Sequence, residues 1–509
     1  MKEVHYLAGC DIGTGGTKAV VIDLEGNVLG EHYIEYPLIT KKESWENYPG
    51  MKAEHDPMMY WESVCICFKE SIRQAKIDPA YIGAVSISAL APACICVDRN
   101  LKPLANGHIW MDRRGTDQAA LLMEEFGAEE SFNISANPID PYFNISKFMW
   151  EKDNRADLYQ KTYKVQTAAD FPVMMLTGEA VTDYSNASLY GIAFDIRKRK
   201  WRTDILEKIG IDPEKLPEVY PCDKIIGEVT RSAASSSGLS PGTPVVAGLY
   251  DIDAAAVSTG VIDESKMNVI AGTWCNNQYV SKTPIISDRF FSTTVFSNPG
   301  YYLMLEGSPT SASNLEWFVG EFLQAENKIA KQKGTSVFDI CNEAVKKTNP
   351  EDTDIVFVPF LYGSNAKPNA KSVILGLQGW HKREHVIRAI YEGICFSHKW
   401  HVDKLMEYRE KPNAARFAGG ASRSDVWLQM FADVLQMPME ITRAEELGTL
   451  GAAICGAVGI GVFESFDSAS KKMVHVDRRF DPQKDKEEIY NRKFKRYKKA
   501  IKSLEDYWE

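Results

Sequence analysis

The sequence has no apolar run of the length that a membrane-spanning helix needs. Such a helix takes roughly 18 or more consecutive apolar residues, and none of the apolar runs in this chain of 509 residues is that long. A secretory signal is missing as well, because the first apolar run, YLAGC, is short and ends at Asp11. We therefore expect a cytoplasmic protein with no membrane partner.

Positive charge is also in short supply. The chain has 59 Lys and Arg residues against 69 Asp and Glu residues, which gives a formal net charge of −10. Nucleic-acid-binding domains are typically basic, so we expect no nucleic-acid partner. The most basic stretch, NRKFKRYKKAIK (491–502), alternates with aromatic residues at helical spacing, and we interpret it as the solvated face of a helix.

The ten cysteines form no recognisable metal-binding or disulfide pattern. The two close pairs, Cys65/Cys67 and Cys94/Cys96, are separated by a single residue, whereas zinc sites usually have wider intervals. We expect all ten thiols to be reduced and buried, in line with a cytosolic redox compartment.

Length and composition are those of an ordinary globular protein with two or three domains. The sequence is 44% apolar and 25% charged, which is typical of globular chains. We predict two halves, residues 1–248 and 249–509. Within the first half, Asp56-Pro57 predicts the start of a helix, and the Ser-rich stretch 231–244 predicts a loop before the last strand.

The most informative stretch is GCDIGTGGTKAVVIDLEGNVLG (9–30), which concentrates glycine near the N-terminus. A P-loop would need Gly-Lys followed by Ser or Thr, but Lys18 is followed by Ala19. A dinucleotide-binding loop of the Rossmann kind would open a helix, but the residues after Gly16 are β-branched and apolar. The pattern instead predicts a β-hairpin followed by a third strand.

This hairpin has the residues that could bind a phosphate chain. Gly13, Gly15 and Gly16 have no Cβ that would keep an anion away from the backbone N–H groups. Asp11, at the end of the first strand, is placed to bind a phosphate-bound Mg²⁺, and Lys18 is placed to neutralise phosphate charge. The alternative is an ordinary hairpin with a solvated aspartate and lysine.

Two further glycine-containing elements support a duplicated architecture. NVIAGTWCNNQYVSK (268–282) again predicts a strand, a Gly-Thr turn and a strand, which suggests two halves of related fold facing a shared ligand. RFAGGASRSDVWLQMFADVL (416–435) predicts a strand ending in Gly419-Gly420 and then a helix whose apolar face packs into a core. The small residues at 419–421 would let a flat purine or ribose approach the backbone.

These three elements, together with ELGTLGAAICGAVGIGVF (446–463), resemble the FGGY family of carbohydrate kinases over nearly the whole chain and in the same order. The resemblance implies an α/β protein with the two-domain, duplicated actin/hexokinase-like (ribonuclease H-like) fold, which holds nucleotide and sugar in the interdomain cleft. Within the family, EGSPTSASNLEWF (306–318) and AIYEGICFSH (389–398) are most similar to the pentulose kinases.

The resemblance also implies which residues bind the nucleotide. They come from the two hairpins and the third glycine element, and the implied ATP-binding residues are Gly13, Thr14, Gly15, Lys18, Gly272, Thr273, Gly419, Gly420 and Ser424. Some relatives carry asparagine at the position of Ser424. Asp11 is the implied ligand of Mg²⁺.

The family's catalytic aspartate follows a Val-Val-Ala-Gly strand, which here begins VVAGLYDIDAAAVSTG (245–260). Counting back from Gly272-Thr273 favours Asp251 as the base, with Asp253 as the alternative. Either could instead cap a helix, because the segment from Ile252 is rich in alanine and predicts a helix. The two roles are compatible, since a helix N-terminus favours an ionised carboxylate at neutral pH.

The sugar-binding residues implied by the resemblance lie in HIWMDRRGTD (108–117) and are Trp110, Asp112 and Arg114, with Asp251 as the fourth. An aspartate accepts hydrogen bonds from hydroxyls, and an aromatic face covers a carbon skeleton. The alternative is an exposed Asp-Arg pair on a loop. The chain departs from the family just before this segment, where SALAPA (88–93) lacks the polar residues of its relatives. A substrate that is smaller than a pentulose, or that carries its hydroxyls differently, is therefore an alternative.

We predict ATP-dependent phosphorylation of a small ketose, with L- or D-xylulose as the first candidate and ribulose, erythritol or glycerol as alternatives. An actin- or chaperone-like nucleotide switch would share the fold and the hairpins, but it would not need the Trp-Met-Asp-Arg-Arg segment or a second aspartate in the cleft. A sugar-sensing regulator would need a DNA-binding module, for which the sequence offers no candidate. A homodimer is the candidate oligomer, and the sequence alone does not select it.

Overall fold

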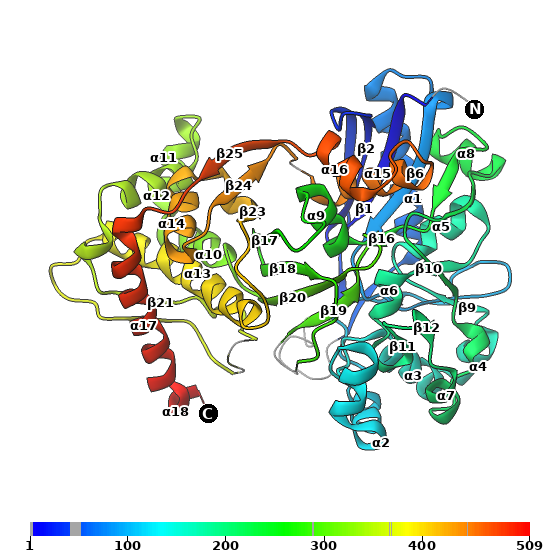
Figure 1. Ribbon diagram of the computed structural model, residues 1–509, viewed down its shortest axis with the longest axis horizontal. Helices are drawn as coiled ribbons and strands as arrows, with labels where there is room; N and C mark the ends of the chain where they lie inside the picture. The colour runs from blue at the N-terminus through cyan, green and yellow to red at the C-terminus, as the bar shows by residue number, and fades with distance from the viewer. Residues whose placement is uncertain are drawn as a thin grey trace.

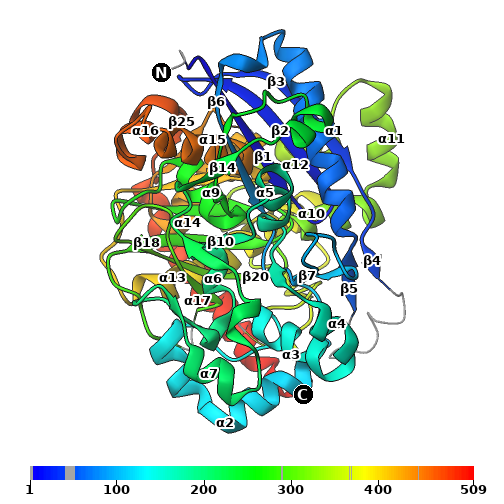
Figure 2. The same ribbon diagram turned by 90° about the vertical axis from the view of Figure 1, so that its right-hand side faces the viewer.

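Two seven-stranded mixed sheets form the framework of the molecule, a computed structural model (Figure 1). The structure describes residues 4–40, 52–287, 290–365, 367, 369–444 and 446–508. In Figure 1 the first sheet lies at upper right, with its N-terminal strands in blue, and the second sheet runs across the centre toward the upper left. The view turned by 90° shows the helices that surround both sheets (Figure 2).

The first sheet contains the predicted N-terminal hairpin. Strands β1, β2 and β3 form an antiparallel meander, and β6 pairs in parallel with the other edge of β1. No helix intervenes between β1 and β2, so the hairpin and its third strand are confirmed. The strands of this sheet are β1 (Tyr6–Ile12), β2 (Gly16–Asp23), β3 (Val28–Glu35), β6 (Ile82–Ala89), β14 (Ile225–Glu228), β15 (Pro244–Val246) and β16 (Leu249–Tyr250).

The second sheet repeats this plan. Strands β17, β18 and β20 pair antiparallel in that order, β19 pairs with the outer edge of β20, and β23 pairs in parallel with the other edge of β17. The duplication expected from the two glycine hairpins is therefore present in the strand order. The strands are β17 (Lys266–Ala271), β18 (Cys275–Ser281), β19 (Ser292–Val295), β20 (Tyr302–Ser308), β23 (Ala414–Ala418), β24 (Met439–Thr442) and β25 (Val476–Phe480).

A helix from late in the chain braces the first sheet. Helix α15 (Leu447–Gly459) packs against β1, β6 and α9 (Asp251–Thr259), and in Figure 1 the orange α15 lies beside the blue strands. The contact needs glycine, because a Cβ at Gly9 would lie 2.1 Å from the Thr449 carbonyl oxygen. This close approach brings the start of α15 to the carboxyl end of β1, where Asp11 lies.

Three predicted helices are present. Helix α1 (Pro57–Ala75) begins as expected, with the Asp56 side chain accepting a hydrogen bond from the Met58 N–H group. Helix α14 (Asp425–Leu435) buries the predicted apolar face. The basic stretch lies in α17 (Glu487–Ser503), whose cations are exposed except for Lys493, which is buried and pairs with Glu392 at 2.6 Å.

The prediction of a loop over the Ser-rich stretch 231–244 is wrong for its first half, which forms helix α8 (Arg231–Ser237). The Thr230 side chain caps the helix by accepting a hydrogen bond from the Ala233 N–H group, and Gly238 ends it in the left-handed conformation. Ala233 and Ala234 are buried in a hydrophobic core. Two caps and this burial outweigh the weak helix propensity of serine.

The remaining elements complete the two lobes. The other helices are α2 (Thr116–Ser135), α3 (Asn144–Asn154), α4 (Ala156–Lys161), α5 (Asp170–Thr177), α6 (Tyr184–Ser188), α7 (Thr203–Lys208), α10 (Ser313–Phe322), α11 (Gln324–Gln332), α12 (Val337–Lys346), α13 (Arg383–Met406), α16 (Phe466–Met473) and α18 (Glu505–Trp508). Short strands outside the two sheets are β4 (Ile39–Thr40), β5 (Ala53–His55), β7 (Ile95–Val97), β8 (Gly107–His108), β9 (Lys164–Gln166), β10 (Val181–Asp183), β11 (Phe194–Asp195), β12 (Lys200–Trp201), β13 (Glu218–Tyr220), β21 (Val356–Val358) and β22 (Val373–Leu375).

The cysteines and the helices also bear on the exclusions made from the sequence. All ten cysteines belong to the described residues, and each is buried with a free thiol. Within the same residues, no helix combines the length and the apolar composition that crossing a membrane requires. The division of the chain at residue 248 stays a prediction, and β16, just beyond it, pairs with β6 in the first sheet.

Candidate active site

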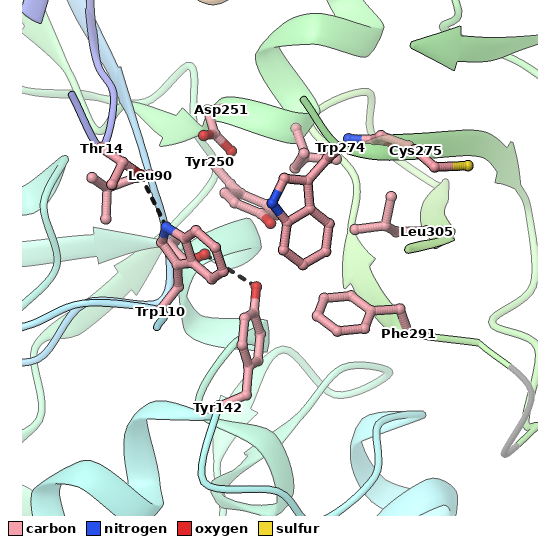
Figure 3. A pocket seen from close by; sticks show the side chains of 14 residues that line it. Thr14, Leu90, Trp110, Tyr142, Tyr250, Asp251, Trp274, Cys275, Phe291 and Leu305 are labelled. Carbon is pink, nitrogen blue, oxygen red and sulfur yellow. Dashed lines mark hydrogen bonds between the residues drawn. The ribbon is translucent and has the colours of Figure 1, made fainter. Parts of the chain in front are cut away.

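A cavity of about 210 Å³ lies between the two sheets (Figure 3). Both halves of the chain contribute to its wall, since β18 and β20 lie on one side and the ends of β1 and β6 on the other. The residues that line it are Thr14, Leu90, Ala91, Trp110, Tyr142, Tyr250, Asp251, Ile252, Trp274, Cys275, Asn276, Phe291, Leu305 and Gly307.

Asp251 points into this cavity from the first turn of α9. Tyr250, not Asp251, occupies the N-cap position, and its side chain caps nothing. Asp251 Oδ1 is shielded from bulk solvent and has no hydrogen-bond partner in the described structure. A buried carboxylate oxygen without a partner is uncommon in a folded protein, and the hydroxyl of a bound ligand would supply that partner.

The environment of Asp251 corrects one expectation. Burial raises the pKa of its carboxyl well above the ordinary value, and the charge of Asp11 raises the pKa further. The hydrogen bond from the Ile252 N–H group acts in the opposite direction and is the smaller effect. Desolvation and a nearby carboxyl therefore oppose the effect of the helix N-terminus on the pKa of this group.

Asp253, the alternative base, lies fully buried outside the cavity lining. Its two carboxylate oxygens accept hydrogen bonds from the Thr294 hydroxyl, the Ser297 N–H group and the Ser297 hydroxyl, each at 3.2 Å. These bonds tie α9 to β19 and the turn after it. Asp253 therefore has a structural role, and Asp251 is the aspartate of this pair that reaches the cavity.

Asp11 lies among polar side chains of three neighbouring elements. The strand register places it opposite Ser88 on β6 and Lys18 on β2, and the Ser88 hydroxyl donates a hydrogen bond to Asp11 Oδ1. A Cβ at Gly448 would lie 2.2 Å from Asp11 Cγ, so only glycine allows α15 to approach this carboxyl. Burial, assisted by the charge of Glu446, raises the pKa of Asp11 to about 6.

Lys18 is not free to meet a ligand in this structure. Its ammonium lies 3.1 Å from the Glu31 carboxylate and 2.9 Å from the Glu446 carboxylate. Glu446 could not be anticipated as a partner, because it is more than four hundred residues away from Lys18 in the chain. A contact between Lys18 and phosphate stays a prediction and would require Lys18 to leave at least one of them.

The turn of the first hairpin is fixed by hydrogen bonds to its backbone. The Gly13 N–H group donates to the Gly16 carbonyl at 2.8 Å, and the Tyr36 hydroxyl donates to the Gly13 carbonyl at 2.7 Å. Nothing lies within 4 Å of the position that a Cβ would take at Gly15. A ligand can therefore approach the backbone of a turn that is already held in place.

The turn of the second hairpin lies against the third glycine element. A Cβ at Gly419, whose φ is +93°, would lie 2.8 Å from the Gly272 nitrogen. The Thr273 carbonyl accepts hydrogen bonds from the Ser311 N–H group and the Ser313 hydroxyl, which lie at the start of α10. The structure thus brings together the predicted ATP-binding residues Gly272, Thr273, Gly419 and Gly420, although 145 residues separate the two glycine motifs.

Ser424 occupies the N-cap of α14. Its hydroxyl accepts a hydrogen bond from the Trp427 N–H group at 3.2 Å and donates one to Asn342 Oδ1 at 2.6 Å. The side chain is buried, and these two hydrogen bonds give it a structural role at the start of the helix. Its predicted contact with adenosine stays a prediction.

Aromatic side chains form much of the cavity wall. Trp110 Nε1 donates a hydrogen bond to the Thr14 hydroxyl at 3.0 Å, which links the predicted sugar-binding segment to the first hairpin (Figure 3). The Trp110 ring contacts the Trp274 ring edge to face, with centroids 5.3 Å apart. Trp110 thus lines the cavity, and its contact with a sugar stays a prediction.

Asp112 and Arg114 lie behind this wall and do not line the cavity. The Asp112 carboxylate is fully buried and accepts hydrogen bonds from the Ala53 N–H group and the Arg114 guanidinium. Arg114 also pairs with Glu54 at 2.7 Å. The interpretation of this pair as a direct sugar contact therefore needs correction, because the two charges satisfy each other and hold β5 against the segment that carries Trp110.

This correction leads to a stability prediction. Asp112→Ala is expected to lower the free energy of unfolding by about 3 kcal/mol, because it leaves the Arg114 charge buried with a single partner. The sugar KM of the folded enzyme should change by less than about threefold, since no cavity contact is lost. Urea denaturation and steady-state kinetics measure the two effects.

Asp204→Ala is the matched control for this variant, because it breaks an Arg-Asp pair with the same spacing that is exposed to solvent. It should cost at most about 1 kcal/mol. A stable Asp112→Ala protein with a greatly raised sugar KM would return Asp112 to the sugar site.

Several residues of the site were not predicted from the sequence. Tyr142, Trp274 and Phe291 line the cavity, and Glu446 contacts Lys18. Trp274 directly follows the Gly272-Thr273 motif, and that adjacency was a usable signal. Tyr142 and Phe291 belong to no motif, and only the packing of the two halves places them here.

Comparison with known families and proteins agrees with this geometry. Residues 6–258 match the model for the N-terminal domain of the FGGY family of carbohydrate kinases, and residues 267–460 match the model for its C-terminal domain. The two matches together span most of the chain and include both hairpins, Asp251 and the third glycine element.

Individual relatives match over the full length. The L-xylulose/3-keto-L-gulonate kinase of Escherichia coli is 29% identical over 512 residues, which cover 99% of this chain and 98% of that protein. A probable L-xylulose kinase of Haemophilus influenzae is 30% identical over 509 residues, which cover 99% of this chain and 100% of that protein. The crystal structure of xylulose kinase from Rhodospirillum rubrum matches with a TM-score of 0.88 and 25% identity over 99% of each chain.

Proposed function

The chain belongs to the FGGY family of carbohydrate kinases, and we propose that it transfers the γ-phosphoryl group of ATP to a terminal hydroxyl of a neutral ketopentose, with L- or D-xylulose as the first candidate. The observation that carries this proposal is the unpartnered Oδ1 of Asp251 beside an aromatic-walled cavity between two glycine-containing hairpins. Full-length similarity to kinases named for xylulose supports the substrate class.

The residues of the cleft fit a nucleotide with its metal ion. At Gly15, Gly272 and Gly420, nothing lies within 4 Å of the position of a Cβ, so a phosphate chain could approach the backbone of all three elements. Kinases of this family use ATP, generally with Mg²⁺. Asp11 is the carboxylate that would hold this ion, since it lies near the carboxyl end of β1, next to the first glycine turn, and the hydrogen bond from Ser88 engages its Oδ1 and not its Oδ2. When bound, Mg²⁺ would neutralise phosphate charge in the transition state.

Asp251 supplies the proton acceptor. The sugar hydroxyl oxygen forms a bond to the γ-phosphorus while the bond between that phosphorus and the bridging oxygen breaks and ADP leaves. The hydroxyl proton passes to Asp251 Oδ1 late in this step, because a carboxylate cannot deprotonate an alcohol beforehand. Until then, the carboxylate aligns the attacking oxygen, and alignment of this kind removes roughly 7 kcal/mol or more of the barrier.

The charge of the cavity favours a neutral sugar over a sugar acid. The name of the Escherichia coli relative pairs L-xylulose with 3-keto-L-gulonate, and the second of these carries a carboxylate. Among the described residues that line the cavity, none is Lys, Arg or His, and the one carboxyl group is that of Asp251. A substrate carboxylate would therefore be desolvated without a cation to pair with it.

The contrasting hypothesis is a nucleotide switch that hydrolyses ATP without a sugar. We expect the rate of ADP release to rise by about 10²-fold or more when a ketopentose is added. The cavity would hold the sugar hydroxyl in position to receive the phosphoryl group, whereas a water molecule would not be held in this way. A coupled ADP-release assay with L- and D-xylulose, L- and D-ribulose, erythritol, glycerol and 3-keto-L-gulonate tests this. Equal ATP hydrolysis with and without every compound would favour the switch, and preferred turnover of the keto acid would contradict a neutral substrate.

The homodimer and the cytoplasmic location stay predictions. The nucleotide contacts of Lys18 and Ser424 also belong to this proposal, because both side chains have protein partners in the structure.

A further inference from the structure

We infer that Ser185 is a positioning residue for phosphoryl transfer, whose hydroxyl holds the backbone at Tyr250 and thereby the direction of the Asp251 side chain. This inference rests on the proposed function, in which Asp251 accepts the proton of the sugar hydroxyl. It follows from a chain of hydrogen bonds that reaches the edge of the cavity from the helix behind it.

The backbone just before Asp251 is a very short strand that leads directly into a helix. Strand β16 has two residues, Leu249 and Tyr250, which pair with Ser88 and Ala89 of β6. Tyr250 is also the N-cap residue of α9, and its side chain makes no capping hydrogen bond. Figure 3 shows its side chain next to that of Asp251. Whatever fixes the backbone of Tyr250 therefore also sets the direction in which the carboxyl points.

Ser185 supplies an anchor for this backbone. The Tyr250 N–H group donates a hydrogen bond to the Ser185 hydroxyl at 3.0 Å. Ser185 belongs to α6, which packs against β16 and β19, and α6 lies close to β16 in Figure 1. Both residues are buried, so bulk water does not reach this bond. Without the hydroxyl, the N–H group would be left unsatisfied in the interior, which is costly.

The orientation of the Ser185 hydroxyl is set by Asp183, the N-cap residue of α6. The hydroxyl donates its proton to Asp183 Oδ2 at 2.6 Å, which leaves its lone pairs for the Tyr250 N–H group. The Asp183 carboxylate is itself held, because it also accepts hydrogen bonds from the Ser185 N–H group and from the Asn186 N–H and amide groups. The hydroxyl is therefore fixed as an acceptor that faces Tyr250.

The same helix contains a matched serine whose hydrogen bonds do not lead to Asp251. The Ser188 hydroxyl donates to the Tyr184 carbonyl at 2.7 Å and accepts a hydrogen bond from the Val295 N–H group at 3.0 Å. Ser188 is buried like Ser185, and Val295 lies on β19 and does not line the cavity. Each serine thus has one donated and one accepted hydrogen bond, and the two differ in whether the accepted bond ends beside the proton acceptor.

Ser185→Ala is expected to lower kcat by about tenfold to a hundredfold, because a small misplacement of the proton acceptor is enough to slow the chemical step by this much. The Kd values of sugar and Mg·ATP should change by less than about threefold. Ser185 does not line the cavity, and the hydrogen bond between the Tyr250 and Tyr142 hydroxyls remains. Single-turnover kinetics and calorimetry separate these quantities.

Ser188→Ala is the matched control. It removes the same number of buried hydrogen bonds, so the urea midpoint should fall by an amount similar to that of Ser185→Ala. Its kcat should stay within about threefold of the wild-type value. An unchanged kcat in Ser185→Ala overturns the inference. Equal losses of kcat in the two variants also overturn it, because they would reflect a general loosening of α6.

A double variant tests whether Ser185 acts through Asp251. In an Asp251→Asn background, adding Ser185→Ala should change kcat by less than about threefold, because residues that act as one unit are not additive. Misdirecting a side chain that no longer takes the proton has little left to remove. A further loss as large as in the wild-type background would mean that Ser185 acts through a different group, and the inference would fall.

Ser185→Cys covers the case in which the alanine variant does not fold. The thiol fills the site but is only a weak hydrogen-bond acceptor, so kcat should fall by about tenfold, with Ser188→Cys as its control. A wild-type kcat in Ser185→Cys overturns the inference and leaves the proposed function intact. ATP hydrolysis by the wild-type protein that no ketose accelerates overturns both. The two failures are therefore distinguishable.

Discussion

Asp251→Asn is expected to lower kcat by about 10² to 10⁴, the range lost when a positioned general base is removed. Asparagine keeps the shape of the side chain and can still accept a hydrogen bond from the sugar hydroxyl, but it cannot take the proton. Sugar affinity should change by less than about tenfold, since the lost interaction belongs to the transition state. Single-turnover kinetics and calorimetric titration with the sugar separate these two quantities.

The matched control is Asp253→Asn, two residues along the same helix. Asp253 accepts hydrogen bonds from Thr294 and Ser297, and an amide can satisfy most of them. We expect kcat within about tenfold of the wild-type value and a small loss of thermal stability. If Asp253→Asn abolishes turnover while Asp251→Asn retains it, the roles of the two aspartates are reversed. If both variants turn over normally, the base is a different residue.

The pH dependence of the reaction provides a second measurement on Asp251. Burial and the neighbouring Asp11 raise the pKa of its carboxyl, and a base works only when it is deprotonated. Activity is therefore lost as the pH falls through this raised pKa, so the acid limb of kcat/KM should lie at a higher pH than for an ordinary aspartate. An acid limb near pH 4 would contradict the desolvated environment described here.

Asp11→Ala is expected to lower kcat/KM for Mg·ATP by about 10² to 10³, because it removes the carboxylate that would hold the metal beside the phosphates. Sugar affinity should remain almost unchanged, since Asp11 does not line the cavity. Kinetics over a range of Mg²⁺ and ATP concentrations measure the first effect, and calorimetry with the sugar measures the second.

Ser88→Ala provides a graded control for the same site. It removes the hydroxyl that donates to Asp11 Oδ1 and should weaken the use of Mg·ATP by about tenfold. A protein with lost sugar affinity and normal nucleotide affinity after Asp11→Ala would place Asp11 at the other end of the cleft.

Local chemistry determined the framework of the protein. Glycine next to β-branched runs predicted both hairpins, and the strand that ends at Gly419-Gly420 was equally clear. Such patterns are informative because a tight turn and an alternating strand depend on residues that are neighbours in the chain. Asp251 was selected through the resemblance to the family, by counting back from the Gly272-Thr273 turn, and its role as the base stays a prediction.

Tertiary packing decided which polar groups face the ligand. Asp112 and Arg114 are residue types that often bind sugars, but here they form an ion pair with each other behind the cavity wall. Lys18 pairs with Glu446, and that partner is brought in by a helix from the other end of the chain. Which residue a charged side chain pairs with depends on contacts between distant parts of the chain. A local sequence pattern does not contain that information.

The side of the cavity that faces the second sheet was decided in the same way. Trp274, Phe291 and Leu305 come from three separate segments, and each alone has the character of an ordinary core residue. They form the end of a substrate cavity only because the second sheet meets the first across the cleft. The sequence by itself determined the chemistry of phosphoryl transfer, whereas the shape and polarity that select the sugar arise where the two halves pack together.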